Sequence, residues 1–74
     1  MDDIAAILKE IRPEYEFTES DDFIADQMLD SFDVVTLVSE LDRRFTIAID
    51  GADIVPENFR NLAAIGKLLQ KYGK

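Results

Sequence analysis

The sequence predicts a small all-α fold, a bundle of three longer helices and one short helix with a long connection after the first helix. Apolar residues recur at helical spacing in segments 2–12, 31–45 and 61–73. Only residues 45–51 alternate apolar with polar side chains, and no second strand-like run exists to pair with them. With 74 residues the chain is expected to form one domain, residues 1–74. A core of this size supplies only about 3–5 kcal/mol of net stability.

The first helix is predicted over residues 2–12 and ends before Pro13, because proline cannot continue the hydrogen-bond ladder. Residues 13–30 show no sustained period and include several acids. We expect this long connection to be ordered, since its apolar side chains can pack against the helices. These side chains are Tyr15, Phe17, Phe23, Ile24, Met28 and Leu29.

The second helix is predicted over residues 31–45, with Ser31 as its N-cap. A full capping box is not expected, because Val34 stands where that motif requires Glu or Gln. Asp33 is expected on the outward face, and Arg43 and Arg44 suit the helix dipole in the last turn. The predicted apolar face consists of Val34, Leu37, Val38, Leu41 and Phe45.

Residues 45–51 are predicted to be a connector that carries Ile47 and Ile49 into the core. The following segment, residues 52–59, is expected to make a single helical turn before Pro56. The last helix is predicted over 61–73 with an apolar stripe on one face. The stripe consists of Leu62, Ile65, Leu68, Leu69 and Tyr72.

Composition excludes several classes of function. The chain has no cysteine, which rules out disulfides and thiolate metal sites, and no histidine, the commonest general base. A net charge of −8 argues against nucleic acid and anionic membranes and suits docking on basic surfaces. No apolar run approaches the ~20 residues that span a bilayer, and MDDIAAILKE does not resemble a signal peptide. We expect a monomeric, cytoplasmic protein without membrane insertion.

The sequence offers no catalytic constellation. Serine is present without histidine, and no lysine lies near Ser31 in sequence. We therefore expect no catalytic residues and no enzyme activity. Residues 50–58, DGADIVPEN, depart from the EF-hand pattern and are interpreted as a turn, so no dedicated metal site is expected.

Residues 28–45, MLDSFDVVTLVSELDRRF, closely resemble the D-S-[L/F/M] signature and second helix of acyl carrier proteins. Asp30, Ser31 and Phe32 supply the triplet. Residues 47–69 resemble the loop, short third helix and fourth helix of that family, so the likeness covers about the whole chain. It implies a four-helix bundle of the acyl-carrier type.

The resemblance implies that Ser31 is the attachment site of phosphopantetheine, transferred from coenzyme A by a phosphopantetheinyl transferase. The thiol of this arm holds cargo as a thioester and so supplies the sulfur that the chain lacks. A helix N-terminus favours the phosphate, whereas Asp30 and Asp33 oppose it by repulsion. The resemblance also suggests that Asp30 presents the site to the transferase.

The second helix is expected to contact partner enzymes, namely a loading ligase and acyltransferases or synthases. Phe32 and Val35 lie beside the attachment site. The expected surface continues over Thr36, Glu40 and Asp42. Arg43 and Arg44 depart from the acidic pattern of fatty-acid carriers, and indicate either dipole compensation or a different set of partners.

The cargo stays open at this stage. LDSF also resembles D-alanyl and other aminoacyl carriers, but DIVPENFRNLAAI favours acyl cargo of fatty acid or related biosynthesis. A fatty chain could enter between the helices, or the same residues could form a closed core. These residues are Val38, Leu41, Ile49, Ile54 and Ile65. The rival of another class is a small acidic helical interaction module, with Ser31 as an ordinary cap and no cofactor.

Overall fold

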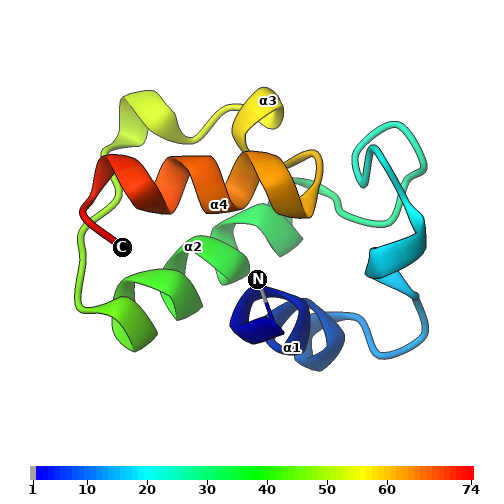
Figure 1. Ribbon diagram of the computed structural model, residues 1–74. Helices are drawn as coiled ribbons and strands as arrows, with labels where there is room; N and C mark the ends of the chain where they lie inside the picture. Colours follow the sequence, from blue (N-terminus) through cyan, green and yellow to red (C-terminus); the bar gives the residue numbers. More distant parts are fainter. Residues whose placement is uncertain (1) are drawn as a thin grey trace.

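Four α-helices and two 3-10 turns make up the described part of the chain, residues 2–74 of the computed structural model (Figure 1). They are α1 (Asp2–Ile11), the 3-10 turn η1 (Phe17–Glu19), α2 (Ser31–Phe45), the 3-10 turn η2 (Gly51–Asp53), α3 (Pro56–Phe59) and α4 (Leu62–Lys71). No strand occurs among these residues, which confirms the predicted all-α fold. No helix within them is long and apolar enough to cross a membrane.

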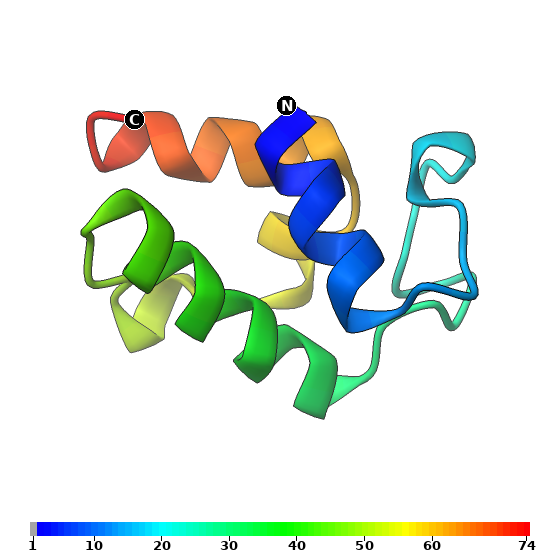
Figure 2. The same ribbon diagram turned by 90° about the horizontal axis from the view of Figure 1, so that it is seen from below.

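The helices pack through the apolar faces that their sequences predict. α1 contacts both α2 and α4, and the short α3 contacts α4. The C-terminal end of α1 lies close to the first turn of α2 (Figure 2). Buried side chains recur at positions three and four apart on each long helix, as a core-facing stripe requires. They are Ile4, Ile7 and Leu8 of α1, Leu37, Val38 and Leu41 of α2, and Ile65, Leu68 and Leu69 of α4.

The long connection between α1 and α2 is ordered, as predicted. Phe17, Phe23 and Leu29 are buried in the same core as the helices. The rings of Phe17 and Phe23 meet edge to face at 5.0 Å. The backbone N–H of Phe23 donates to the carbonyl of Arg60 at 2.5 Å, so the connection is also fixed to the segment between α3 and α4. These contacts hold the chain that leads directly into α2.

The chain between α2 and α4 agrees with the predictions in part. Ile49 is buried and Ile47 is partly buried, which confirms the connector. One 3-10 turn, η2, precedes Pro56 as predicted, but a second turn, α3, begins at Pro56, so this segment makes two turns rather than one. Proline suits the first position of a helix, where its missing N–H would have no partner and its fixed φ is already helical.

Replacing a buried aromatic of the long connection should test how far that connection supports the fold. Phe23 is 0% exposed. We expect Phe23→Ala to lower the free energy of unfolding by about 3–5 kcal/mol through cavity formation, which is comparable to the whole stability of a domain this small. Phe32, which is 82% exposed, is the matched control, and Phe32→Ala should change stability by less than about 0.5 kcal/mol. Urea denaturation followed by circular dichroism measures both, and similar losses would contradict the burial argument.

Candidate functional site

The first turn of α2 is closed by a reciprocal pair of hydrogen bonds between two aspartates. The N–H of Asp33 donates to Asp30 Oδ1 at 2.8 Å, and the N–H of Asp30 donates to Asp33 Oδ2 at 3.2 Å. Asp30 is therefore the N-cap, and the predictions that Ser31 caps the helix and that no capping box forms were both wrong. Counted from Asp30, the third helical position is Asp33, whose short carboxylate does what Glu or Gln usually does there.

Because Asp30 caps the helix, the hydroxyl of Ser31 is not used for capping. Ser31 is the first residue of α2 and lies exposed at the surface. Helix geometry leaves the N–H groups of Ser31 and Phe32 without an intrahelical acceptor. The site thus combines a free primary hydroxyl with unpaired donors and the positive end of a helix dipole. Such an arrangement favours an anionic group on the serine oxygen.

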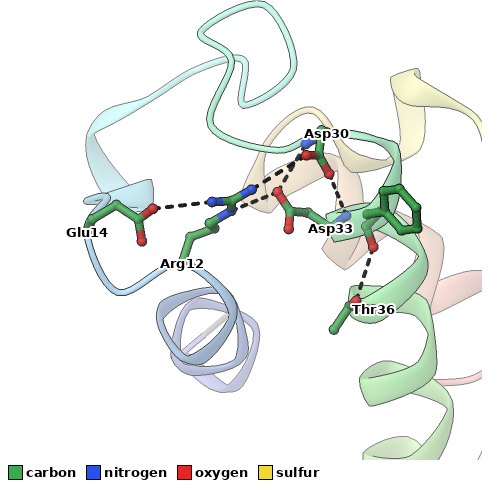
Figure 3. Close-up of polar contacts among 6 residues, drawn as sticks. Arg12, Glu14, Asp30, Asp33 and Thr36 are labelled. Carbon is green, nitrogen blue, oxygen red and sulfur yellow. Dashed lines mark hydrogen bonds and ion pairs between the residues drawn. The ribbon is translucent and has the colours of Figure 1, made fainter.

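Arg12, directly after α1, is fixed to the carboxylates of this turn (Figure 3). Its Nε donates to Asp33 Oδ2 at 2.9 Å, and its Nη2 lies 3.5 Å from Asp30 Oδ2. Its Nη1 lies 3.4 Å from Glu14 Oε2. The hydrogen bond from Arg12 to Asp33 raises the pKa of the guanidinium, so Arg12 keeps its charge. The expected outward position of Asp33 was wrong, since its side chain is 13% exposed and faces Arg12.

An apolar groove of about 370 Å³ opens beside Ser31. α2 contributes one wall, and the long connection and the segment before α3 contribute the others. The lining residues are Ile24, Leu29, Asp30, Ser31, Val34, Val35, Ile54, Val55 and Pro56. Two exposed apolar side chains stand next to the serine, Phe32 at 82% and Val35 at 59% exposed. The surroundings of the hydroxyl are therefore apolar on the groove side and acidic on the side of Arg12.

The five residues predicted to line an acyl cavity are divided between two places. Ile54 lies in the groove beside Ser31. The other four are buried in the hydrophobic core: Val38, Leu41, Ile49 and Ile65. Sequence reasoning missed most of the groove lining. The sequence places Val35 beside Ser31, and helical spacing also indicates Val34, three positions along, but nothing local indicates Ile24 or Pro56.

The residues predicted to contact partners differ in their availability. Phe32, Val35 and Thr36 are exposed on α2. Two others have partners within the chain. Glu40 pairs with Arg43 at 2.6 Å and Arg44 at 3.3 Å, and Asp42 Oδ1 accepts from the N–H of Ile49 at 3.0 Å.

Arg43 and Arg44 both form ion pairs with Glu40 of their own helix. Arg43, followed by Arg44, lowers the pKa of Glu40. Arg44 also reaches α1, where it lies 2.6 Å from Glu10. The arginines therefore have intramolecular roles, and the middle of α2 presents apolar and neutral side chains rather than free carboxylates.

A second cluster fixes the segment that carries Ile54. Asp53 accepts hydrogen bonds from Lys71 Nζ at 2.8 Å and from the hydroxyl of Tyr72 at 2.7 Å. The N–H of Asp50 donates to the same Tyr72 hydroxyl at 2.8 Å. Lys71, followed by Tyr72, lowers the pKa of Asp53. The end of α4 thus anchors the groove wall, a role for Asp53 that the sequence did not indicate.

The described residues contain no group of three or more acidic side chains arranged to hold a metal ion. The two aspartates at the start of α2 are instead joined to Arg12.

The fold and the site are those of a small helical domain that presents one serine at the start of its longest helix. Comparison with family models gave a match to the phosphopantetheine attachment site over residues 2–69. The chain therefore belongs to the phosphopantetheine-binding family and is a carrier protein whose cofactor is covalently attached phosphopantetheine. No curated protein and no solved structure matched the chain.

The anchor at Asp53 should make stability depend on pH. Because the folded pKa is depressed, ionised Asp53 stabilises the fold above its unfolded pKa of about 3.9, and this contribution is lost as the pH falls through the folded value. We expect Asp53→Asn to lower the melting temperature at about pH 7 and this difference to shrink progressively as the pH falls below about 3.9. The control is Asp21→Asn, which removes the same charge from an exposed residue. An equal change of melting temperature with pH in both variants would show that Asp53 does not anchor the groove wall in this way.

Proposed function

We propose that residues 1–74 form an acyl carrier domain in which Ser31 bears the phosphopantetheine arm. The observation that carries this proposal is the exposed Ser31 hydroxyl at the start of α2, freed from capping by Asp30 and open to the apolar groove. Thr36 and Ser39, the other exposed hydroxyl residues of α2, lie within the helix and not at its start. The family match supports the attachment of the arm, and the geometry supports this serine as its place.

The residues around Ser31 fit such a group. The free N–H groups of the first turn and the helix dipole favour the phosphate, and Arg12 offsets part of the repulsion from Asp30 and Asp33. When bound, the group supplies a thiol that holds cargo as a thioester, which the cysteine-free chain cannot do itself. The apolar groove offers the arm and its cargo a wall that excludes water. In this proposal the chain carries the arm and presents its thioester, and the partner enzymes catalyse the reactions of the cargo.

A phosphopantetheinyl transferase is the first partner that this proposal requires. Phe32 and Val35 stand beside Ser31 and offer it an apolar contact. One carboxylate oxygen of Asp30 caps the helix. Asp30 directly precedes Ser31 and is therefore placed to help the transferase recognise the serine. A loading ligase and acyltransferases or synthases would use the same end of α2. Tethering the cargo raises its effective concentration at each of these enzymes.

Acyl cargo of fatty acid or related biosynthesis fits the groove better than an aminoacyl group. Its lining is almost wholly aliphatic, and a volume of about 370 Å³ falls in the range of small-molecule sites. A D-alanyl group carries an ammonium, which gains nothing from aliphatic walls. The D-alanyl or other aminoacyl carrier is therefore the second candidate. A cofactor-free interaction module loses its basis, because the family is defined by phosphopantetheine attachment.

Loading with the arm tests the attachment site directly. Incubation with coenzyme A and a phosphopantetheinyl transferase of broad specificity should add the mass of one phosphopantetheine to the native chain and none to Ser31→Ala. Ser39→Ala, at another exposed serine of α2, is the matched control and should load normally. Intact-mass spectrometry gives the answer. A native chain that stays unmodified with several transferases, or a loaded Ser31→Ala variant, would overturn the assignment.

The capping geometry makes a separate prediction for stability. Ser31→Ala should change the free energy of unfolding by less than about 0.5 kcal/mol, since Ser31 does not cap the helix. Asp30→Ala, which removes the cap, should cost about 1 kcal/mol. Urea titration of both variants distinguishes the two residues. A larger loss for Ser31→Ala than for Asp30→Ala would restore the serine as the cap.

The dependence of the melting temperature on the length of the attached cargo distinguishes acyl from aminoacyl cargo. If an acyl chain enters the groove, each methylene taken from water should add up to about 0.8 kcal/mol to stability until the groove is full. The melting temperature should then rise from the unloaded holo form through butanoyl to octanoyl, with a smaller rise in Ile54→Asn. Alanyl loading should leave it unchanged. A flat series for acyl chains would favour the aminoacyl carrier.

A further inference from the structure

Arg12 joins two helix ends of opposite polarity. It follows the last residue of α1, where the dipole favours a cation, and it binds the first turn of α2, where the dipole favours anions. Pro13 follows at once and keeps the chain from continuing the helix. Arg12 is partly buried and 21 residues from Asp33 in sequence, so the contact is tertiary.

The guanidinium engages both carboxylates of the capping box. Asp33 Oδ2 accepts from Arg12 Nε at 2.9 Å and from the N–H of Asp30 at 3.2 Å. Asp30 uses Oδ1 to accept from the N–H of Asp33, and its Oδ2 lies 3.5 Å from Arg12 Nη2. One cation thus holds in place the two side chains that fix the start of α2 (Figure 3).

Arg12 lies against a different face of α2 from the one that carries the Ser31 side chain. Residues two apart differ by about 200° around an α-helix, so Ser31 and Asp33 project from opposite sides. Ser31 lines the groove, whereas Asp33 faces Arg12. Any influence of Arg12 on the hydroxyl must therefore pass through the orientation of the first turn and through charge.

We propose that Arg12 is a positioning residue for the loading of Ser31. By bridging Asp30 and Asp33 it fixes the turn from which the hydroxyl projects, and it offsets carboxylates that would repel an incoming phosphate. This inference rests on the proposed attachment at Ser31. It concerns a residue that lies outside the D-S-F triplet and contacts no part of the serine side chain.

The chain offers a matched control at the other end of α2. Arg44 also links α1 to α2, through Glu10 at 2.6 Å and Glu40 at 3.3 Å. Arg44→Met removes the same charge and an ion pair between the same two helices. It does so far along α2 from Ser31, so it reproduces a merely structural effect without touching the capping box.

The experiment measures kcat and KM of a phosphopantetheinyl transferase with the native chain and its variants as substrates. Arg12→Met should lower kcat about tenfold, because a small displacement of a reacting group is costly. KM should change little, since Phe32 and Val35 are retained. Arg44→Met should stay within about twofold of the native chain. Arg12→Lys keeps the charge but lacks the planar guanidinium, whose separate nitrogens face the two carboxylates in a fixed geometry, and should fall between native and Arg12→Met.

Two further measurements, amide exchange and a double-mutant cycle, show whether Arg12 acts through the capping box. The amide of Asp33 should exchange with solvent faster in Arg12→Met, while amides in the middle of α2 keep their native rates. In a double-mutant cycle, Arg12→Met should add little to the loss already caused by Asp33→Asn. Additive losses would show that Arg12 acts by another route and would overturn the inference.

The possible failures are distinguishable. A native chain that is never loaded overturns the proposed function, and this inference with it. A native chain that loads while Arg12→Met and Arg44→Met load at the same rate overturns the positioning role alone. If Arg12→Met does not fold, Arg12→Lys decides, because native kcat in that variant would show that a positive charge without the guanidinium geometry is enough, which overturns the positioning role.

Discussion

The reciprocal hydrogen bonds between Asp30 and Asp33 fix the residue at which α2 begins, and much of the site depends on that start. With Asp30 as the cap, Ser31 becomes the first helical residue and its hydroxyl is left free. The same start turns Val34 and Val35 toward the groove and, one turn later, Leu37 into the core. A shift of the helix register by one residue relative to the bundle would rotate every one of these side chains by about 100°. Capping and presentation of the serine are thus one geometric constraint.

Basic residues are scarce in this chain, and several of them join distant segments. Sixteen acidic residues face eight basic ones. Arg12 joins the end of α1 to the start of α2, Arg44 joins α2 back to α1, and Lys71 joins α4 to the segment that carries Ile54. Each pair brings together groups that the chain alone would leave apart. The remaining carboxylates are left to give the surface its negative field, which suits encounter with basic partners.

The neighbourhood of Ser31 is divided by chemistry. On one side lie the aspartates and Arg12, and on the other lie aliphatic side chains from α2, the long connection and the segment before α3. If the arm is attached at Ser31 as proposed, its phosphate would lie near unpaired N–H groups, and apolar cargo would have a route along the groove. The anchor formed by Asp53, Lys71 and Tyr72 keeps one wall of that groove in place. The division explains how a chain without cysteine or histidine can serve as a carrier of phosphopantetheine.

Local rules in the sequence determined the helices, because a helix depends on spacing between near neighbours. The span of α2 follows from it, and Pro13 sets the end of α1. The aromatics of the long connection were expected to be buried because they are apolar, since that segment has no helical period. The triplet that begins at Asp30 also indicated the family. Tertiary structure decided the rest: the identity of the cap, the inward position of Asp33, the anchor at Asp53 and the walls of the groove. The cap is a local pair, but the sequence offers both Asp30 and Ser31 for it, and only the structure chooses between them. The other three depend on where a side chain from another segment lies, and a contact across 21 residues leaves no periodic trace in sequence.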